Sequence, residues 1–385
     1  MNAPANKRPA CKLFDEKFYS KQCGISFDSS AHAWRHYCEN GAENGCEPAP
    51  YFMSKWYRWQ NPDCQAFSSV LEHFEKVGKH RIIDPSPYVD LVQVSRGSGA
   101  ENSVSAYLKL LESELTSRQG VYNDISELEE NQAAFLKNIQ IEKLFDCFEQ
   151  SKNTKRNCLV WVQIGPDSKF REWFNKGQER SWDVLCNWYS FDAVDLSIGE
   201  IGFAQKGTKF TGILKVLQNY KETFSQYEQV ILIDDDLEFN FSDIDKLFQI
   251  ARDNNLSMFQ PSLTEDSYCI WPDIKSTKHT GVIPFNTVEI MMPGFSKDFL
   301  LSNQSLFEET VSGFGLDLAL GRVAAREGLE VGVIYDVKAK HHKPINQSTG
   351  AFYDYLRSFG INSKLELWRL IEKYSLDTEI KALRK

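Results

Sequence analysis

The fold is decided by the stretch Val230-Ile231-Leu232-Ile233-Asp234-Asp235-Asp236. Four consecutive aliphatic residues, rich in β-branched side chains and too few for a stable helix, predict a strand buried on both faces, as in a parallel sheet covered by helices. Three carboxylates follow directly, and adjacent like charges cost free energy unless a cation or a donor-rich ligand neutralises them. Residues i and i+2 of an extended segment point the same way, so Asp234 and Asp236 can converge on one ion while Asp235 faces elsewhere. The stretch therefore predicts a metal site at the end of a buried strand, with a solvated acidic turn as the alternative.

The composition is that of a globular protein, with 42% hydrophobic and 25% charged residues in a chain of 385 residues. A formal net charge of −9 argues against a nucleic-acid-binding protein, which needs a basic face. We see no signal peptide and no apolar run near the ~20 residues that span a bilayer, so we expect no transmembrane segment. A cytoplasmic location follows, compatible with peripheral association at the inner face of the cell membrane. The nine cysteines form no CxxC pair, which favours free thiols over zinc ligands; a disulfide in the first module is the alternative.

Residues 14 to about 90 contain an internal repeat with an offset of 37 or 38 residues. The segment Phe14–Tyr19 is echoed by Phe52–Tyr57, and His36 by His73. Repeats of this length predict small helical units that bury their apolar faces by stacking. A third copy starts at Ile83 and is then lost. We expect the many aromatic residues of this module to form its core, with carbohydrate stacking as the alternative.

Four regions are expected along the chain. Residues 1–100 form the helical repeat module, and 101–155 form a helical spacer in which apolar residues recur at helical spacing as far as Phe148. The spacer is a candidate surface for homo-oligomerisation. Residues 156–345 form the domain that contains the acidic run, and 346–385 form a C-terminal amphipathic helical extension.

The region 156–345 alternates strand and helix patterns, which predicts an α/β fold whose ligands bind at the carboxyl ends of the strands. Helices are expected at 209–224, after a cap at Ser242, and through Val323 to Gly328. The expected strands are 158–164, 184–189, 230–233, 258–261, 288–292 and 331–334.

The acidic run resembles the DxD motif of nucleotide-sugar-dependent glycosyltransferases of the GT-A fold. Together with Val288–Ser296, Gly313–Asp317 and Val331–Ile334, it is similar in order and spacing to a glycosyltransferase-like family of bacteria and plants. The resemblance covers about residues 156–345. It implies a GT-A-like (Rossmann-like), mixed and mainly parallel sheet flanked by helices, and the repeat module before it resembles those attached to bacterial polysaccharide glycosyltransferases.

The implied activity is metal-dependent transfer of a sugar from a nucleotide-sugar donor to a glycan or lipid-linked glycan acceptor in bacterial surface polysaccharide assembly. The implied cofactor is Mn²⁺ or Mg²⁺. By resemblance, Asp236 binds the metal, Asp234 binds the metal or the nucleotide ribose, and Asp235 belongs to the nucleotide-binding cluster without an assigned partner. A late histidine completes the metal shell in such enzymes. His341 is our choice, with His342 as the alternative because the sequence does not determine the strand register.

Asp317 is implied as the catalytic base of an inverting reaction, with Glu289 in reserve. The alternative for Asp317 is an acid at a helix N-terminus that interacts only with the helix dipole. Lys206 and Lys209 lie where a loop meets a helix N-terminus and are candidates to neutralise a diphosphate; surface lysines are the alternative.

Gln163 and Gly165 follow the first strand of the catalytic domain, and by analogy they meet the base or ribose of the nucleotide.

Two other classes of function compete with a transferase. One is a phosphotransferase or phosphatase with an aspartyl nucleophile, although Leu237 stands where that chemistry usually has Thr or Val. The other is a non-catalytic glycan-binding protein.

Overall fold

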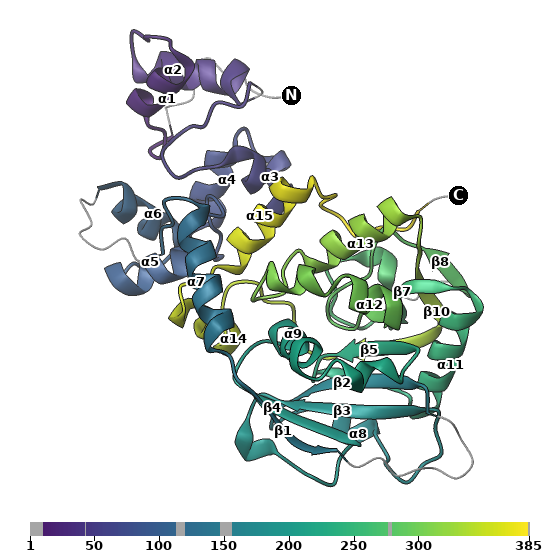
Figure 1. Cartoon of the computed structure of the whole chain (residues 1–385). Coiled ribbons are helices and arrows are strands. Elements are labelled where there is room, and N and C mark those ends of the chain that lie inside the picture. Colours follow the sequence, from purple (N-terminus) through teal and green to yellow (C-terminus); the bar gives the residue numbers. More distant parts are fainter. Residues whose placement is uncertain (1–10, 43, 113–119, 147–155, 276–278, 384–385) are drawn as a thin grey trace. The chain divides into compact units, whose positions relative to one another are not determined.

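The structure is a computed structural model of the chain, and it describes residues 11–42, 44–112, 120–146, 156–275 and 279–383. These residues form two compact units (Figure 1). Unit 1 contains the described residues up to Glu129 together with Ser348–Leu365, and unit 2 contains 130–347 and 366–383. None of the helices in the described ranges combines the length and the apolar character needed to span a membrane.

Unit 1 is built from three successive pairs of helices. The first pair is α1 (Glu16–Cys23) and α2 (Ser30–His36), which continues into the π-helical turn η2 (Tyr37–Gly41). The second is α3 (Ser54–Gln60) and α4 (Val70–Val77), joined through the 3₁₀ turn η3 (Pro62–Ala66). The third is α5 (Leu91–Ser98) and α6 (Ser103–Glu112).

The predicted repeat is visible as repeated hydrogen bonds. The Tyr19 hydroxyl lies 2.7 Å from His36 Nδ1, and the Tyr57 hydroxyl lies 2.6 Å from His73 Nδ1. A backbone bond recurs in all three pairs, from Asp15 N–H to Pro48 O, from Met53 N–H to Pro85 O and from Asp90 N–H to Gly120 O. The prediction that the third copy is abandoned is therefore wrong. Its described part has two helices and the recurring backbone bond, but its sequence lacks the Tyr–His pair that made the first two copies recognisable.

The aromatic residues of unit 1 form its core, as predicted. Trp56, Tyr57 and Phe74 are almost completely buried, and Trp34 is 8% exposed. The Tyr57 ring contacts Phe52, His73 and Phe74 with ring centroids 5.0–6.0 Å apart. Burial of this kind stabilises the stack through apolar area and ring packing, and it leaves these faces unavailable for sugar stacking.

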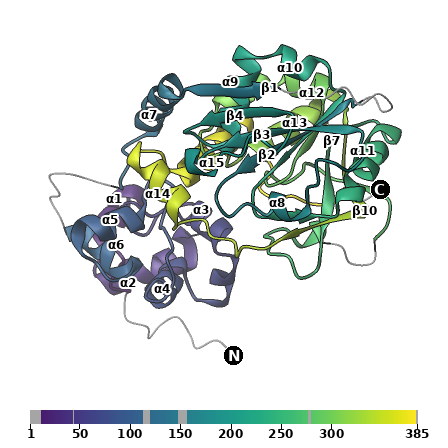
Figure 2. The ribbon, with the colours of Figure 1, turned by 90° about the horizontal axis from the view of Figure 1, so that it is seen from below.

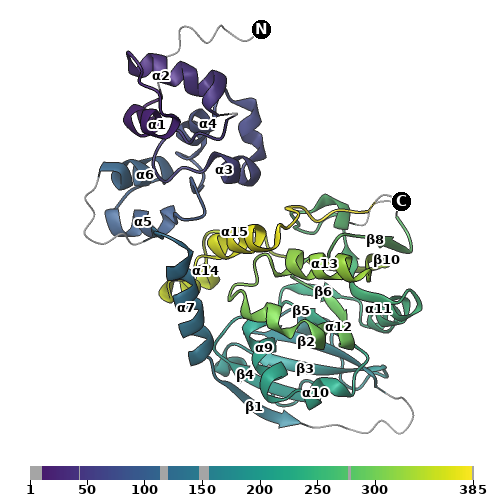
Figure 3. The same ribbon diagram turned by 45° about the horizontal axis from the view of Figure 1, so that its top comes forward.

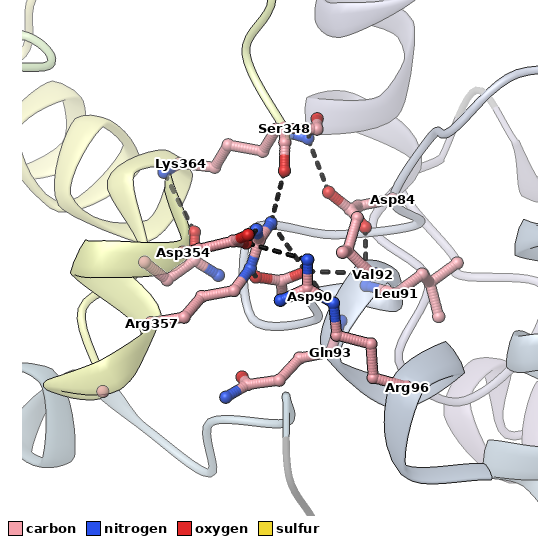
Figure 4. Close-up of polar contacts among 12 residues, drawn as sticks. Asp84, Asp90, Leu91, Val92, Gln93, Arg96, Ser348, Asp354, Arg357 and Lys364 are labelled. Carbon is pink, nitrogen blue, oxygen red and sulfur yellow. Dashed lines mark hydrogen bonds and ion pairs between the residues drawn. The ribbon is translucent and has the colours of Figure 1, made fainter. Parts of the chain in front are cut away.

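A late segment of the chain, containing α14 (Ala351–Ser358) and the start of α15 (Ser363–Tyr374), completes unit 1. Asp90 accepts a hydrogen bond of 2.6 Å from Arg357 Nε, and Asp84 accepts one of 2.5 Å from Lys364 Nζ (Figure 4). Both acids are buried and also cap backbone N–H groups of α5. Of the predicted C-terminal extension 346–385, Ser348–Leu365 belong to unit 1 and the described residues from Glu366 onward belong to unit 2.

Unit 2 is an α/β domain, which confirms the predicted fold class. Over the described residues its mixed sheet has ten strands in the order β1-β4-β3-β2-β5-β9-β7-β10-β6, with β8 paired to β10 (Figure 2). Its longest pairings, β2 with β3 and β7 with β10, are parallel. The strands are β1 (Ile141–Asp146), β2 (Cys158–Ile164), β3 (Trp182–Trp188), β4 (Ile201–Gln205), β5 (Gln229–Ile233), β6 (Leu237–Phe239), β7 (Leu256–Leu263), β8 (Val282–Pro284), β9 (Gly294–Ser296) and β10 (Glu330–His341).

Helices cover both faces of this sheet. Leu159 and Val230 belong to a core shared with α9 (Lys209–Asn219), α12 (Lys297–Ser302) and α13 (Leu316–Glu327). On the opposite face, α11 (Phe241–Asp253) packs through Phe241 on Trp182 and through Phe248 on Phe259. The remaining α-helices described in this unit are the end of α7 (Ile125–Asn138), α8 (Phe170–Trp173), α10 (Glu222–Ser225) and the part of α15 from Glu366 onward. The strand predicted at 230–233 is therefore buried on both faces, as expected for all five residues of β5.

Two predicted elements are wrong. Residues 288–292 form a turn and not a strand, because the Glu289 carboxylate accepts a 2.8 Å bond from Met291 N–H while Glu289 N–H donates to the Gln260 side chain. The helical pattern extended as far as Phe148 ends at Asn138, and β1 follows as an edge strand. Phe145 packs there on Gly202, where an added Cβ would lie 2.2 Å from the Phe145 ring. The predicted spacer is consequently divided between the third helix pair of unit 1 and the sheet of unit 2; Phe148 itself lies outside the described residues.

The strand order reverses next to β2. The chain runs from β2 to β3 to β4 in one direction and then returns to place β5 on the other side of β2, with all three pairings parallel. At such a reversal the connections diverge and leave a crevice at the carboxyl ends of the two central strands, where ligands bind in open α/β sheets. Asp234 follows β5 directly at this position.

Candidate active site

The first of the three acids, Asp234, is paired with a lysine from a helix N-terminus. Its Oδ1 lies 2.6 Å from Lys209 Nζ, and its N–H donates to the Met291 carbonyl. Lys209 is the first residue of α9, which is capped by reciprocal bonds between Thr208 and Thr211. Its ammonium also donates to the Met291 carbonyl at 3.3 Å, and the side chain is only 8% exposed. Lys209 is thus a buried counter-charge and not a surface lysine.

The third acid, Asp236, is joined by the predicted histidine. His341 ends β10, and its Nε2 lies 3.5 Å from Asp236 Oδ2. Its Nδ1 lies 2.8 Å from the Tyr268 carbonyl oxygen, which can only accept, so Nδ1 carries a proton; Nε2–H of the protonated ring faces Asp236, and loss of that proton frees a lone pair at Nε2. Such a ring is prepared for a ligand or a metal ion on the Asp236 side.

The strand register decides between the two histidines. In the pairing of β6 with β10, His341 is opposite Leu237 and Lys340 is opposite Glu238. His342 lies past the end of β10 and turns away, with its Nε2 2.6 Å from Glu238. Of the two, the structure therefore brings His341 to the acidic cluster.

The electrostatics of the Asp236–His341 pair favour a charged carboxylate. Burial alone would raise the pKa of Asp236, but the hydrogen bond and charge of His341 lower it below the ordinary value. Burial opposes charging of His341 as well, yet its bonds to Asp236 and to the Tyr268 carbonyl raise its pKa. An ionised Asp236 is the form that binds a cation.

The middle acid, Asp235, has partners that the sequence analysis did not identify. The Tyr189 hydroxyl donates to its carboxylate, and Lys343 Nζ lies 3.8 Å from Asp235 Oδ1 and 3.7 Å from Asp236 Oδ2. Burial raises the pKa of Asp235. Tyr189 directly follows β3, at the same edge of the sheet as the acids, and this position was the signal that could have revealed it.

Gly165 follows β2 directly, whereas Gln163 lies within that strand, and the role of Gly165 is explained by packing. A Cβ on Gly165 would lie 1.9 Å from the Tyr189 hydroxyl oxygen, so glycine allows the tyrosine to reach Asp235. Gln163 is buried in the sheet, where its side-chain oxygen accepts from Trp161 Nε1 at 3.3 Å and from Asn187 Nδ2. Lys206 is exposed, with Nζ 5.7 Å from the centre of the Phe191 ring.

Asp317 and Glu289 lie close enough to the first acid to share its electrostatic environment. Burial raises the pKa of Asp317 to about 7, although Leu318 N–H donates to its carboxylate at 2.8 Å. Burial, together with the charges of Asp317 and Asp234, raises the pKa of Glu289 to about 8. Burial also raises the pKa of Asp234 to about 6, opposed by Lys209. Asp234, Glu289 and Asp317 thus share one buried cation, which lowers the pKa of each.

Two glycines with positive φ precede Asp317. Gly313 has φ +88°, and a Cβ there would lie 2.4 Å from the Phe210 ring. Gly315 has φ +81° and stands at the N-cap position of α13. Both conformations favour glycine. They place Asp317 in the first turn of α13, near enough to Lys209 for the charge of that lysine to lower the pKa of Asp317.

A divalent cation fits this site only in part. In the described ranges, no three His, Cys, Asp or Glu side chains gather closely enough to hold a metal ion by themselves. Asp236 and His341 offer one carboxylate and one imidazole nitrogen. Mg²⁺ and Mn²⁺ commonly take only one or two carboxylates and complete their shells with substrate phosphates and water. The donor set therefore suits an ion that arrives with a phosphorylated ligand, whereas Asp234 is already neutralised by Lys209.

The raised pKa of Glu289 predicts a pH-dependent cost to stability. An unfolded glutamate ionises near pH 4.3, whereas folded Glu289 keeps its proton to about pH 8. The protonated Glu289 therefore contributes its full share of the free energy of unfolding below about pH 4.3, and this share is lost as the pH rises through about 8. Glu289→Gln should gain stability relative to wild type by about 2 kcal/mol between about pH 6 and pH 9 in urea unfolding. A constant difference over this range would contradict a protonated Glu289.

No protein-family model matches the sequence, and no sequence among the curated proteins matches it. Among solved structures, part of the chain is similar to GalNAc-T7 crystallised with UDP, GalNAc and Mn²⁺ (9% identity, TM-score 0.38), with 59% of this chain covered. The match spans 55% of the GalNAc-T7 chain, a little over half its length. S. aureus TarS 1-349 (12% identity, TM-score 0.35) and its complex with UDP-GlcNAc (11%, 0.35) are similar over 57% of this chain and 72% of theirs.

Proposed function

We propose that this protein is a glycosyltransferase of the GT-A type that moves a sugar from a nucleotide-sugar donor to a hydroxyl group of a glycan acceptor. One observation carries the proposal. Asp236 and His341, from the ends of two different strands, meet beside the reversal of strand order at the carboxyl end of β5. In open α/β sheets this is where nucleotides bind, and an acidic cluster there needs a cation before it can accept a diphosphate.

Asp236 and His341 would hold Mn²⁺ or Mg²⁺. Asp234, whose charge Lys209 already balances, would bind the ribose rather than the metal. When bound, the ion would act as a Lewis acid that stabilises the charge of the departing nucleoside diphosphate. Lys343 has a half-exposed ammonium within 3.7 Å of Asp236, so it can turn from the carboxylates to a phosphate oxygen. Tyr189 and Asp235 border the same position.

Asp317 would accept the proton of the acceptor hydroxyl as that oxygen attacks the sugar, which inverts the anomeric centre. A general base works best with a pKa near the operating pH, and the pKa of Asp317 is about 7. Glu289, with a pKa of about 8, is mostly protonated at neutral pH and is less suited to this role. We assign Lys209 to holding Asp234 in place, since its ammonium is buried among acceptors of the protein.

The proposal extends to the setting of the reaction. The resemblance of the DxD region and of the repeat module points to a glycan or lipid-linked glycan acceptor in bacterial surface polysaccharide assembly. The enzyme would act in the cytoplasm, at the inner face of the membrane, and the spacer 101–155 would be its surface for homo-oligomerisation.

The test is a calorimetric titration of the full chain with UDP, GDP, CDP and ADP, each with and without MnCl₂. We expect one nucleotide to bind in the micromolar range only when Mn²⁺ is present. The corresponding nucleotide sugars should then be hydrolysed or transferred with release of the nucleoside diphosphate. If no nucleotide binds in a metal-dependent way, the proposal fails. Labelling of Asp234 by beryllium fluoride would instead support an aspartyl phosphotransferase.

A further inference from the structure

Glu366 is a fully buried carboxylate that the proposed reaction does not use directly. It lies in α15, in the part of that helix that belongs to unit 2. Its two oxygens accept four hydrogen bonds from uncharged donors. The donors are Gln132 Nε2 at 2.5 Å, Val311 N–H at 2.7 Å, Ser312 N–H at 2.9 Å and the Thr310 hydroxyl at 3.0 Å.

Three of these four donors belong to the turn 310–313, which leads into α13. Thr310 Oγ1 in turn accepts from Gly313 N–H at 3.0 Å, and Gly313 O accepts from Leu316 N–H at 3.1 Å. Asp317 is the next residue. A continuous path of hydrogen bonds therefore runs from the Glu366 carboxylate to the first turn of the helix that carries the proposed base. Figure 3 shows α15 beside α13.

The same turn is bound on its other side to the helix that carries Lys209. The Thr208 hydroxyl donates to the Val311 carbonyl, and Thr208 caps α9 immediately before Lys209. Leu367 and Leu370 of α15 lie 3.0 and 3.2 Å from the position of a Cβ on Gly315. The turn thus joins the donor side of the site, with Lys209 and Asp234, to the acceptor side, with Asp317.

A buried carboxylate is a costly way to hold a turn. Desolvation of the charge opposes folding, and neutral donors offset it less well than a cation would. A glutamine or an apolar side chain in its place would avoid the buried charge but would leave some of these donors unpaired, which also costs free energy. A carboxylate is the one side chain of this length that accepts from all four donors at once, because an amide nitrogen would meet donors on one side.

We propose that Glu366 is a positioning residue, which holds the 310–315 segment so that Asp317 has the geometry needed to activate the acceptor. This inference rests on the proposed function of the site. Misplacement of a catalytic group by about 1 Å can lower the rate about 100-fold without affecting the binding of a donor elsewhere in the site. Glu366→Gln places an NH₂ group against two donors and should displace the turn.

The test compares three full-length variants with wild type. These are Glu366→Gln, Thr310→Val, which removes the link to Gly313 at similar volume, and Glu372→Gln, the same change as the first on the exposed face of the same helix. The probes are the nucleotide sugar that the wild type hydrolyses and the matching nucleoside diphosphate with MnCl₂. Hydrogen exchange of the amides at 309–316 is measured in parallel.

We expect Glu366→Gln and Thr310→Val to lower kcat about 10- to 100-fold and to speed amide exchange at 311–313. Nucleotide affinity should stay within about twofold of wild type, and Glu372→Gln should be unchanged in every measurement. Wild-type kcat in both turn variants overturns the positioning role while the proposed function stands. An equal loss of nucleotide affinity and kcat overturns it too, because that is the result of general damage. A wild type that turns over no nucleotide sugar refutes the proposed function itself.

Discussion

Asp236→Ala is expected to abolish Mn²⁺-dependent nucleotide binding and to leave the fold intact. Asp236 is ionised and faces His341 at 3.5 Å, so its removal leaves the cation with a single protein ligand. Removal of a residue that only hydrogen-bonds to a metal ligand typically lowers metal affinity by about 10- to 100-fold. Because Asp236 would be a ligand itself, we expect the affinity for Mn²⁺ plus nucleotide to fall at least about 100-fold. Calorimetry with MnCl₂ and the nucleotide measures this directly, and circular dichroism reports the fold.

Glu238, two residues after Asp236 and within β6, offers a matched control. Glu238 pairs with His342 at 2.6 Å much as Asp236 pairs with His341, but on the exposed side of the strand. Glu238→Ala and His342→Ala should bind metal and nucleotide as wild type does, whereas His341→Ala should resemble Asp236→Ala. Wild-type affinity in Asp236→Ala, or equal losses in both pairs, would refute the assignment.

Asp317→Asn is expected to leave donor binding unchanged and to remove transfer. Asparagine has nearly the same shape, and its side-chain oxygen can still accept from Leu318 N–H, so α13 should begin as before. Loss of a general base typically costs about 10²- to 10⁴-fold in rate. Single-turnover measurement with a saturating nucleotide sugar separates this loss from binding.

The pH profile gives this prediction a second readout. Because a base must be ionised, the wild-type rate should rise with pH through the pKa of Asp317, about 7, and then level off. Asp317→Asn should show no such rise. Glu289→Gln serves as the control and should retain most of the activity. Full activity in Asp317→Asn would mean that Glu289 is the base or that the reaction retains the anomeric configuration.

Much of the central sheet was predictable because the signal was local. Four aliphatic residues before Asp234, and seven apolar-rich residues from Cys158, predicted two strands that the structure contains at nearly the same bounds. The same holds for α13, which ends at Gly328 in the left-handed conformation. In each case the local sequence and the tertiary packing favour the same structure.

The errors arose where tertiary contacts override a local pattern. Val288–Met292 has the composition of a strand, but the Glu289 carboxylate accepts from Met291 N–H and the Gln260 side chain accepts from Glu289 N–H, so the strand starts only at Gly294. Phe145 continues a helical spacing but is held in an edge strand by the close approach of Gly202. Neither partner is near in sequence.

The residues of the candidate site also divide into those predicted from local sequence and those placed by long-range contacts. Asp236 and His341 were predicted through a motif, and the structure brings them together, although their roles remain a proposal. Tyr189 and Lys343 were missed because neither belongs to a motif. Glu366 was missed because it hydrogen-bonds to the turn that leads into α13 rather than to the site residues themselves. Long-range placement of this kind depends on strand order, which a single sequence does not provide.

The most direct test of the account is the position of the metal. Crystals of the full chain would be soaked with MnCl₂ together with UDP or GDP, and anomalous scattering at the manganese edge would locate the ion. We predict a single peak within coordination distance of the Asp236 carboxylate and His341 Nε2, with diphosphate oxygens completing its shell. A peak at Glu238 and His342, or a nucleotide bound away from the carboxyl end of β5, would contradict the account.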